Sequence, residues 1–182
     1  KMAIRMPDTL KTEREEIDEN DWSEIQKVIL EALDYIGDFR KDEGASLEKE
    51  FQLRIGNIRQ YMNDALALDP ERVQAIKDRL QTAIAELKVN VDENRFEQEL
   101  IFYLDKYDIT EEKVRLENHL DYFLKALKSE DSNGKKLGFI AQEMGREINT
   151  IGSKSNYAPM QKLVVQMKDE LEKIKEQLLN VL

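Results

Sequence analysis

Residues 21–39, DWSEIQKVILEALDYIGDF, contain the clearest structural signal in the sequence. Their apolar residues recur at steps of three and four, which is the spacing of one face of an α-helix and not the alternation of a β-strand. The apolar positions are Trp22, Ile25, Val28, Ile29, Ala32, Leu33, Ile36 and Phe39. This stretch therefore predicts a long amphipathic helix.

The composition of the whole chain agrees with long helices and excludes several other classes of protein. Among 182 residues there are three prolines and seven glycines, whereas 36% of the residues are charged. A β-sandwich or barrel needs turn residues every dozen positions or fewer, and this chain has too few of them. Because cysteine is absent, a disulfide scaffold and a cysteine-ligated zinc site are also excluded. A reducing, cytoplasmic compartment is expected.

No segment of the sequence has the pattern of a membrane span or a secretion signal. The longest purely apolar run, residues 100–104, is far too short to cross a bilayer, and no signal-peptide pattern opens the chain. We therefore expect no membrane partner. The first residue is Lys1 and not methionine, which suggests a fragment or a processed protein.

Further amphipathic stripes follow the first one along the chain. Gly44 stands between the first stripe and the second, although an interior glycine costs only about 1 kcal/mol in a helix, so one long bent helix is an alternative. Asp69, which precedes a proline, predicts the start of a new helix, and Asp92 and Thr110 are the expected N-caps of two more. The later helices are expected over residues 47–62, 70–87, 93–106, 111–127, 135–152 and 159–181.

These helices predict an all-α fold, in which an elongated helical arm or hairpin is followed by a C-terminal helical bundle. The expected domains are an irregular remnant of an N-terminal domain over residues 1–20, the arm over 21–90 and the C-terminal helical domain over 91–182. Short connections between the first three helices favour a hairpin-like arm. The last helix repeats its apolar residues almost in heptads, which suits contacts within an oligomer.

Residues 135–152 carry the most unusual helical pattern in the chain. Beside the apolar face lies a face of small residues that would let another helix approach closely. This face consists of Gly138, Ala141, Gly145 and Gly152. A third face consists of Glu143, Glu147, Thr150 and Lys154, flanked by Arg146. Such side chains suit fixed hydrogen bonds and hard cations; the alternative, which the pattern alone favours, is a solvated face with ion pairs one turn apart.

The single histidine, His119, shares a helical stripe with Glu112 and Arg115. It is a candidate general acid or base, or a metal ligand beside Glu112. The alternative is a structural histidine, because the residue borders an apolar face. Upstream, Arg95 and Glu99 lie four residues apart, and an ordinary ion pair is the alternative to a functional role there.

The charge of the chain is unevenly distributed. A formal net charge of −10 argues against a nucleic-acid binder, since binding of phosphate needs a positive surface. Residues 134–168, however, contain six basic and two acidic residues. Lys135 and Lys136 begin an expected helix, where the macrodipole is also positive. An anion such as phosphate could dock there; the alternative is a pair of lysines that only keeps a loop soluble.

Several of these residues belong to longer motifs that resemble those of one bacterial family. The motifs are NRFEQEL (94–100), DITEE (108–112) followed by Arg115, Leu116 and His119, GKKLGF (134–139), QEM (142–144), REINT (146–150) and SKS (153–155). Arg40, Glu43 and Gly44 fit an Arg-x-x-Glu-Gly element. With these motifs the chain resembles the YicC/YloC family over nearly its whole length, most specifically over residues 94–155.

The resemblance implies a metal-dependent endoribonuclease. Described members of the family cleave RNA, depend on a divalent metal and assemble as ring-like hexamers that enclose RNA. They are longer and carry an additional, partly β N-terminal region, so this chain would be a fragment of a larger α+β protein. The implied cofactor is Mn²⁺ or Mg²⁺. The implied partners are RNA, further copies of the chain and other ribonucleases, whereas DNA is not expected.

Carried over by position, the resemblance also implies two sets of site residues. The metal-binding and acid/base set is Glu99, Glu112, His119, Glu143 and Glu147, of which His119, Glu143 and Glu147 are the catalytic candidates. The set for RNA phosphates is Arg95, Arg115, Lys135, Lys136, Arg146 and Lys154.

Two alternatives to the nuclease remain open on the sequence. One is a non-catalytic adaptor that docks RNA or a ribonuclease, and the other is an oligomeric helical scaffold. A nuclease needs the carboxylates of the helices expected at 93–106, 111–127 and 135–152 to converge. A scaffold predicts that these carboxylates scatter or pair with arginine.

Overall fold

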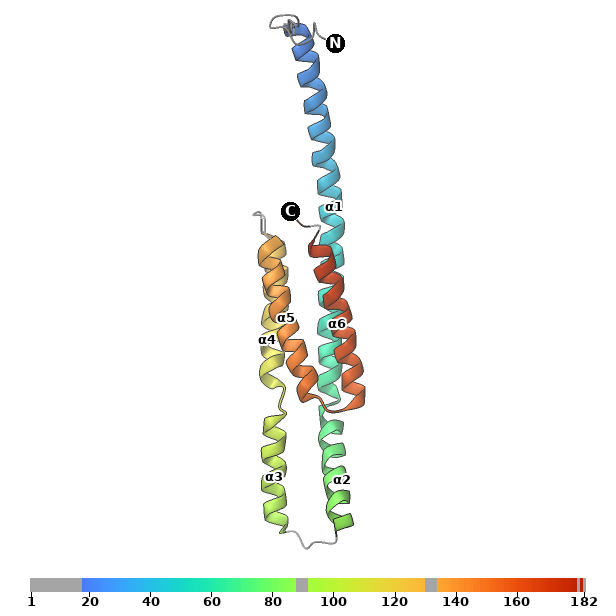
Figure 1. Cartoon of the computed structure of the whole chain (residues 1–182), viewed down its shortest axis with the longest axis vertical. Helices are drawn as coiled ribbons and strands as arrows, with labels where there is room; N and C mark the ends of the chain where they lie inside the picture. Colours follow the sequence, from blue (N-terminus) through green and yellow to red (C-terminus); the bar gives the residue numbers. More distant parts are fainter. Residues whose placement is uncertain (1–17, 88–91, 130–133, 180, 182) are drawn as a thin grey trace, which may run out of the picture. The chain divides into compact units, whose positions relative to one another are not determined.

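The computed structural model describes residues 18–87, 92–129, 134–179 and 181, and in these residues every regular element is an α-helix (Figure 1). The all-α prediction is therefore confirmed. The helices are α1 (Glu19–Ala67), α2 (Asp69–Leu87), α3 (Glu93–Lys106), α4 (Thr110–Leu127), α5 (Gly134–Lys154) and α6 (Ala158–Leu178). None of the described helices is long and apolar enough to cross a membrane.

Helix α1 is continuous through Gly44, so the alternative of one long helix is the correct one. The chain divides into two compact units, residues 1–45 and 46–182, and α1 runs through the boundary. Most of the segment predicted as irregular, residues 1–20, lies outside the described residues. The predicted domain limits at residues 20 and 90 remain predictions.

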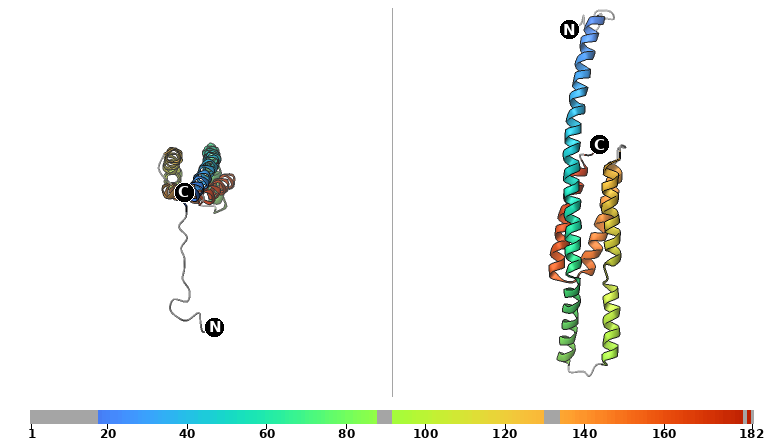
Figure 2. Two further views of the ribbon diagram at one scale, coloured as in Figure 1. Left: turned by 90° about the horizontal axis from the view of Figure 1, so that it is seen from above. Right: turned by 180° about the vertical axis from the view of Figure 1, so that it is seen from behind.

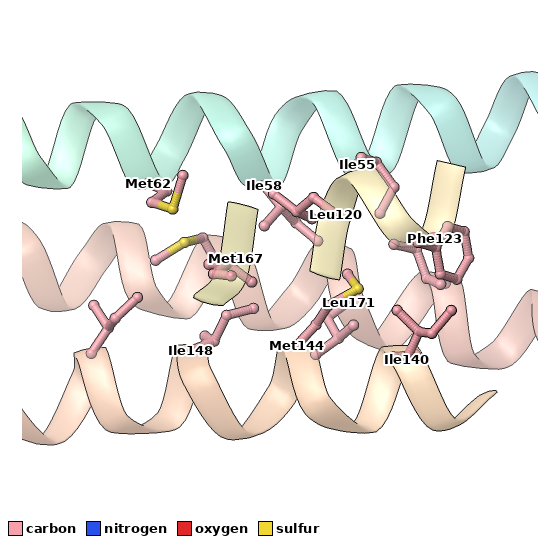
Figure 3. Packing of buried hydrophobic residues seen from close by; sticks show 14 of the residues in the cluster. Ile55, Ile58, Met62, Leu120, Phe123, Ile140, Met144, Ile148, Met167 and Leu171 are labelled. Carbon is pink, nitrogen blue, oxygen red and sulfur yellow. The ribbon is translucent and has the colours of Figure 1, made fainter. Parts of the chain in front are cut away.

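The hydrophobic core of the second unit is built by four helices: α4, α5, α6 and the part of α1 that follows residue 45 (Figure 3). Phe51 of α1 packs edge-on against Phe123 of α4, with ring centroids 5.6 Å apart, and both are fully buried. Complete burial of a side chain of this size contributes about 1.5–3 kcal/mol. The residues labelled in the figure are Ile55, Ile58, Met62, Leu120, Phe123, Ile140, Met144, Ile148, Met167 and Leu171.

Helices α5 and α6 approach each other closely where α5 has glycine. A Cβ atom added to Gly152 would lie 3.0 Å from Cγ1 of Val164, and one added to Gly145 would lie 3.3 Å from Cδ2 of Leu171. A Cβ at Gly138 would meet nothing within 4 Å. The predicted close approach along the small-residue face is thus confirmed at two glycines, and it ends before the third.

The ends of the helices agree with the sequence in most places. Asp92 is the predicted N-cap of α3, and its carboxylate accepts a hydrogen bond from the backbone N–H of Asn94. The prediction of Thr110 as an N-cap is wrong, because Thr110 is itself the first residue of α4. Its N–H and hydroxyl donate to the carboxylate of Asp108, at 3.3 and 2.8 Å. An aspartate bonded to the residue two positions on is a common turn feature.

One buried polar cluster joins α1 to α6. Glu170 is 6% exposed, and its carboxylate accepts hydrogen bonds from Arg54 (3.1 Å), Asn57 (3.0 Å) and Lys173 (2.7 Å). Burial raises the pKa of this carboxyl, but the bonds from Lys173, Asn57 and Arg54 outweigh burial and hold the pKa below its ordinary value. The cluster is a pH-dependent link between the two helices.

Candidate functional site

Helices α4 and α5 are antiparallel neighbours, and two side-chain contacts join them. At one end, Nζ of Lys154 donates to Oε1 of Glu112 at 2.7 Å. At the other end, Nζ of Lys136 lies 5.1 Å from the centre of the Tyr122 ring. Figures 1 and 2 show the two helices side by side over this length. We call the line of residues along which α4 faces α5, from Glu112 and Lys154 to Tyr122 and Lys136, the α4–α5 seam.

The three predicted catalytic residues lie in the middle of the seam. His119 follows Glu112 by seven residues, and Glu147 precedes Lys154 by seven. Seven residues are close to two full turns, about 10 Å, and return to the same face of a helix. His119 on α4, and Glu143 and Glu147 on α5, thus lie in sequence between the two contacts that join the helices. Glu147 is 9% exposed, whereas His119 and Glu143 are half-buried.

The middle of the seam does not form a preformed metal cage. In the part of the chain that the structure describes, no three histidine, aspartate or glutamate side chains gather closely enough to hold a metal ion. Glu143 and Glu147, one turn apart on α5, could supply two carboxylates. Mg²⁺ often binds through one or two carboxylates together with substrate phosphates and water. The residues therefore fit a cation that arrives with its substrate, and they do not fit a three-ligand site.

Glu112 and Lys154, predicted as a metal ligand and a phosphate contact, instead bind each other. Glu112 is 4% exposed, and its second oxygen, Oε2, is buried without a hydrogen bond among the described residues. Nζ of Lys154 also donates to the backbone carbonyl of Asp108 at 2.9 Å. The pair ties the end of α5 to the connection between α3 and α4, so either predicted role requires this contact to open.

The remaining predicted phosphate contacts differ in their availability. Arg115 pairs with Glu111 and Arg146 with Glu143, in both cases on the surface. Exposed pairs of this kind contribute about 0–1 kcal/mol, so a phosphate can compete for either arginine. Lys135 and Lys136 are both exposed in the first turn of α5.

Two predicted residues stand apart from the seam. Glu99 and Arg95 are both exposed on α3, a separate helix. Carboxylates of α3, α4 and α5 do not converge among the described residues. Of the predicted site carboxylates, Glu112 pairs with a lysine and Glu143 with an arginine. The carboxylates of a single chain are therefore arranged as the scaffold alternative predicts, either apart from one another or paired with basic residues.

Two exposed aromatic residues at the Lys136 end of the seam escaped the sequence analysis. Tyr122 is 47% exposed and Phe139 is 68% exposed. Tyr122 continues the stripe of Glu112, Arg115 and His119 at the same spacing. That continuation, an aromatic residue outside the apolar face, was the available signal.

Comparison with known proteins assigns the family. A family model described as "Endoribonuclease YicC-like, C-terminal" matches residues 65–182, which include the whole seam. A "Probable endoribonuclease YicC" of Clostridioides difficile (strain 630) is 36% identical over 183 residues, covering 98% of this chain and 62% of the relative. Its namesake in Haemophilus influenzae is 32% identical over 170 residues, covering 91% and 59%. The chain thus spans about three fifths of the length of these curated relatives. The chain belongs to the YicC-like endoribonuclease family.

Proposed function

We propose that the protein cleaves RNA internally, as an endoribonuclease, and that cleavage takes place at the α4–α5 seam. The observation that carries this proposal is that His119 of α4 and Glu143 and Glu147 of α5 lie between the two contacts that join these neighbouring helices, within the region that the family model matches. The names of both relatives support the reaction class.

Each seam residue has a chemical role in this proposal. His119 transfers a proton, because an imidazole changes its charge close to neutral pH. Arg146 and Lys136 neutralise the negative charge of the phosphate that is cleaved. Glu143 and Glu147 hold Mn²⁺ or Mg²⁺ when the substrate binds; such a cation polarises the phosphoryl oxygen.

The proposed substrate is RNA with accessible single-stranded segments. The described residues contain no β-sheet of the kind that RNA-recognition modules use to stack and read bases. The protein would then select its cleavage site by the shape of the RNA, the charge of the RNA backbone and the presence of unpaired nucleotides.

We also propose that the protein works as a homo-oligomer, with the hexamer as the expected state. In the unit of residues 1–45, α1 carries a stripe of exposed apolar residues at heptad spacing. The stripe consists of Trp22, Ile25, Ile29, Ala32, Ile36 and Phe39, and its large side chains are 42–67% exposed. A contiguous exposed apolar surface is typical of a protein–protein interface. Light scattering on the wild type and on Ile29→Lys measures the assembly; an oligomer of unchanged size in the variant would contradict this interface.

The same stripe supports the second candidate function, an oligomeric scaffold or RNA adaptor. Paired carboxylates in the seam are its specific observation. It differs from the nuclease in one measurable respect, since it binds RNA or a ribonuclease without consuming the RNA.

Cleavage of a labelled, structured RNA by the full-length protein separates the two functions. The reaction is run with Mn²⁺, with Mg²⁺ and with a chelator. We expect His119→Ala, Glu143→Gln and Glu147→Gln to lose about 10²-fold or more in rate while folding and RNA affinity persist. Glu172→Gln is the matched control, because this exposed carboxylate lies outside the seam and pairs with Lys175 on α6. Binding without cleavage under every condition would favour the adaptor, and cleavage that survives all three substitutions would overturn the proposed site.

A further inference from the structure

At the Lys136 end of the seam, two aromatic side chains are exposed and do not belong to the hydrophobic core. Phe123, beside Tyr122 in sequence, is fully buried and belongs to the core. Tyr122 and Phe139 are instead open to solvent over 47% and 68% of their surface. Nζ of Lys136 lies over the Tyr122 ring, so the ring is already part of a positively charged surface.

The surroundings of these rings are basic in an acidic protein. The described residues 122–129 and 134–142 include four lysines and no aspartate or glutamate. The carboxylates at their borders, Asp121 and Glu143, pair with Arg59 and Arg146. The lysines are Lys125, Lys128, Lys135 and Lys136. The connection between the two segments adds Glu130 and Asp131 to the sequence, so residues 122–142 contain four basic and two acidic residues. The first turn of α5 contributes a further partial positive charge.

Rings and lysines alternate along this end of the seam. Phe139 lies one turn from Lys135 and from Lys136, so each ammonium group is a neighbour of the ring on the helix surface. Lysines attract a phosphate backbone irrespective of sequence, while exposed rings stack on unpaired bases. An acidic peptide would use the lysines without needing the rings, and duplex RNA hides the faces of its bases.

The position of the rings relates them to the proposed reaction. Tyr122 follows His119 by three residues on α4, and Phe139 precedes Glu143 by four on α5. These separations correspond to about 5–6 Å along the helices. A nucleotide held on the rings therefore places a neighbouring phosphate about one helical turn from the ring residues, toward His119 on α4 and Glu143 on α5.

We infer that Tyr122 and Phe139 form a stacking subsite for an unpaired nucleotide of single-stranded RNA, next to the phosphate that is cleaved. The inference rests on the proposed function and adds the feature that the substrate must present. Because stacking accepts any base, the subsite selects unpaired nucleotides and tolerates their identity.

Binding and cleavage by the full-length protein test the subsite. Fluorescence anisotropy in a chelator measures affinity for a single-stranded RNA, for the same strand in a duplex and for the strand with abasic positions. We expect Tyr122→Leu and Phe139→Leu each to weaken single-strand binding about ten-fold, and to leave duplex and abasic binding almost unchanged. Tyr122→Phe should restore most of the affinity. Phe102→Leu is the matched control, because Phe102 is 69% exposed on α3.

The lysines provide an independent readout in the same assay. Lys125→Gln and Lys135→Gln should weaken all three RNAs alike and reduce the salt dependence of binding, whereas the leucine variants should not change that dependence.

The outcomes separate this inference from the proposed function. Wild-type affinity and cleavage in both leucine variants would overturn the subsite and leave the nuclease standing. Equal losses for single-stranded, duplex and abasic RNA would also overturn the subsite, since the rings would then only support the fold. An acidic peptide that binds with the same dependence on the rings would overturn RNA as the occupant. Ring-dependent binding by a protein that never cleaves would support the subsite and refute the nuclease.

Discussion

Replacing Lys154 by methionine tests whether the Glu112–Lys154 pair holds the fold or serves the reaction. Methionine preserves much of the apolar stem of the lysine but removes its charge. The partner that remains, Glu112, is 4% exposed and already has one oxygen without a hydrogen bond among the described residues. The substitution therefore leaves a buried carboxylate with no cation beside it.

The size of the effect follows from the different burial of the two partners. An isolated buried charge lowers the free energy of unfolding by about 3–5 kcal/mol. The opposite change, Glu112→Gln, is expected to cost only about 1–2 kcal/mol, because the side chain of Lys154 is 27% exposed and keeps the carbonyl of Asp108 as an acceptor. The double substitution removes both charges and should cost about as much as Glu112→Gln alone.

Urea unfolding at pH 7, followed by circular dichroism at 222 nm, measures all three variants. If Lys154→Met costs no more than Glu112→Gln, or if the two losses add in the double variant, the pair is not the buried link described above. RNA cleavage is then measured on the folded double variant. Wild-type cleavage there assigns both residues to the fold, whereas lost cleavage with intact folding returns them to the predicted metal and phosphate sets.

Two further predictions concern stability. The lowered pKa of Glu170 contributes stability that is fully present above the ordinary glutamate pKa, about 4.3, and is lost as the pH falls through the lowered folded-state pKa. Acid titration of unfolding should show this loss in the wild type and a flatter curve in Glu170→Gln; equal curves would contradict it. On α5, Gly138→Ala should stabilise the protein by about 0.5–1 kcal/mol, because its Cβ meets open space. Gly152→Ala should destabilise it by about 1–2 kcal/mol, because its Cβ would lie 3.0 Å from the β-branched Val164; equal gains at both glycines in urea unfolding would refute the close approach.

The helices were predictable because their signals are local. Apolar spacing located α1, α2, α4, α5 and α6, and the N-cap signal of Asp92 located α3. Gly44 did not break α1, since the cost of one interior glycine is small beside the cooperative propagation of a helix of 49 residues. Thr110 was wrongly predicted as an N-cap. Its backbone N–H instead donates to the carboxylate of Asp108, two residues earlier.

The site was predictable only as far as the face of a single helix. Spacing on α5 placed Glu143 and Glu147 together, and spacing on α4 placed His119 with Glu112. The contact between Glu112 and Lys154 joins residues 42 positions apart, and no periodicity reveals which helices become neighbours or how they align. For that reason periodicity could not show that these two residues, which the family resemblance placed in separate functional sets, bind each other.

The negative net charge of the chain has a functional consequence if RNA binds at the α4–α5 seam. In α1 and the residue before it, positions 18–45 hold nine acidic and three basic residues, while positions 122–129 and 134–142 hold four lysines and no carboxylate. RNA is repelled by the first group and attracted by the second, within a screening length of about 8 Å at physiological salt. Non-productive binding is therefore suppressed along residues 18–45, and the basic end of the seam can remain small. Such a small positive surface releases few counterions, so RNA affinity should fall less steeply with salt than it does for proteins with broad basic surfaces.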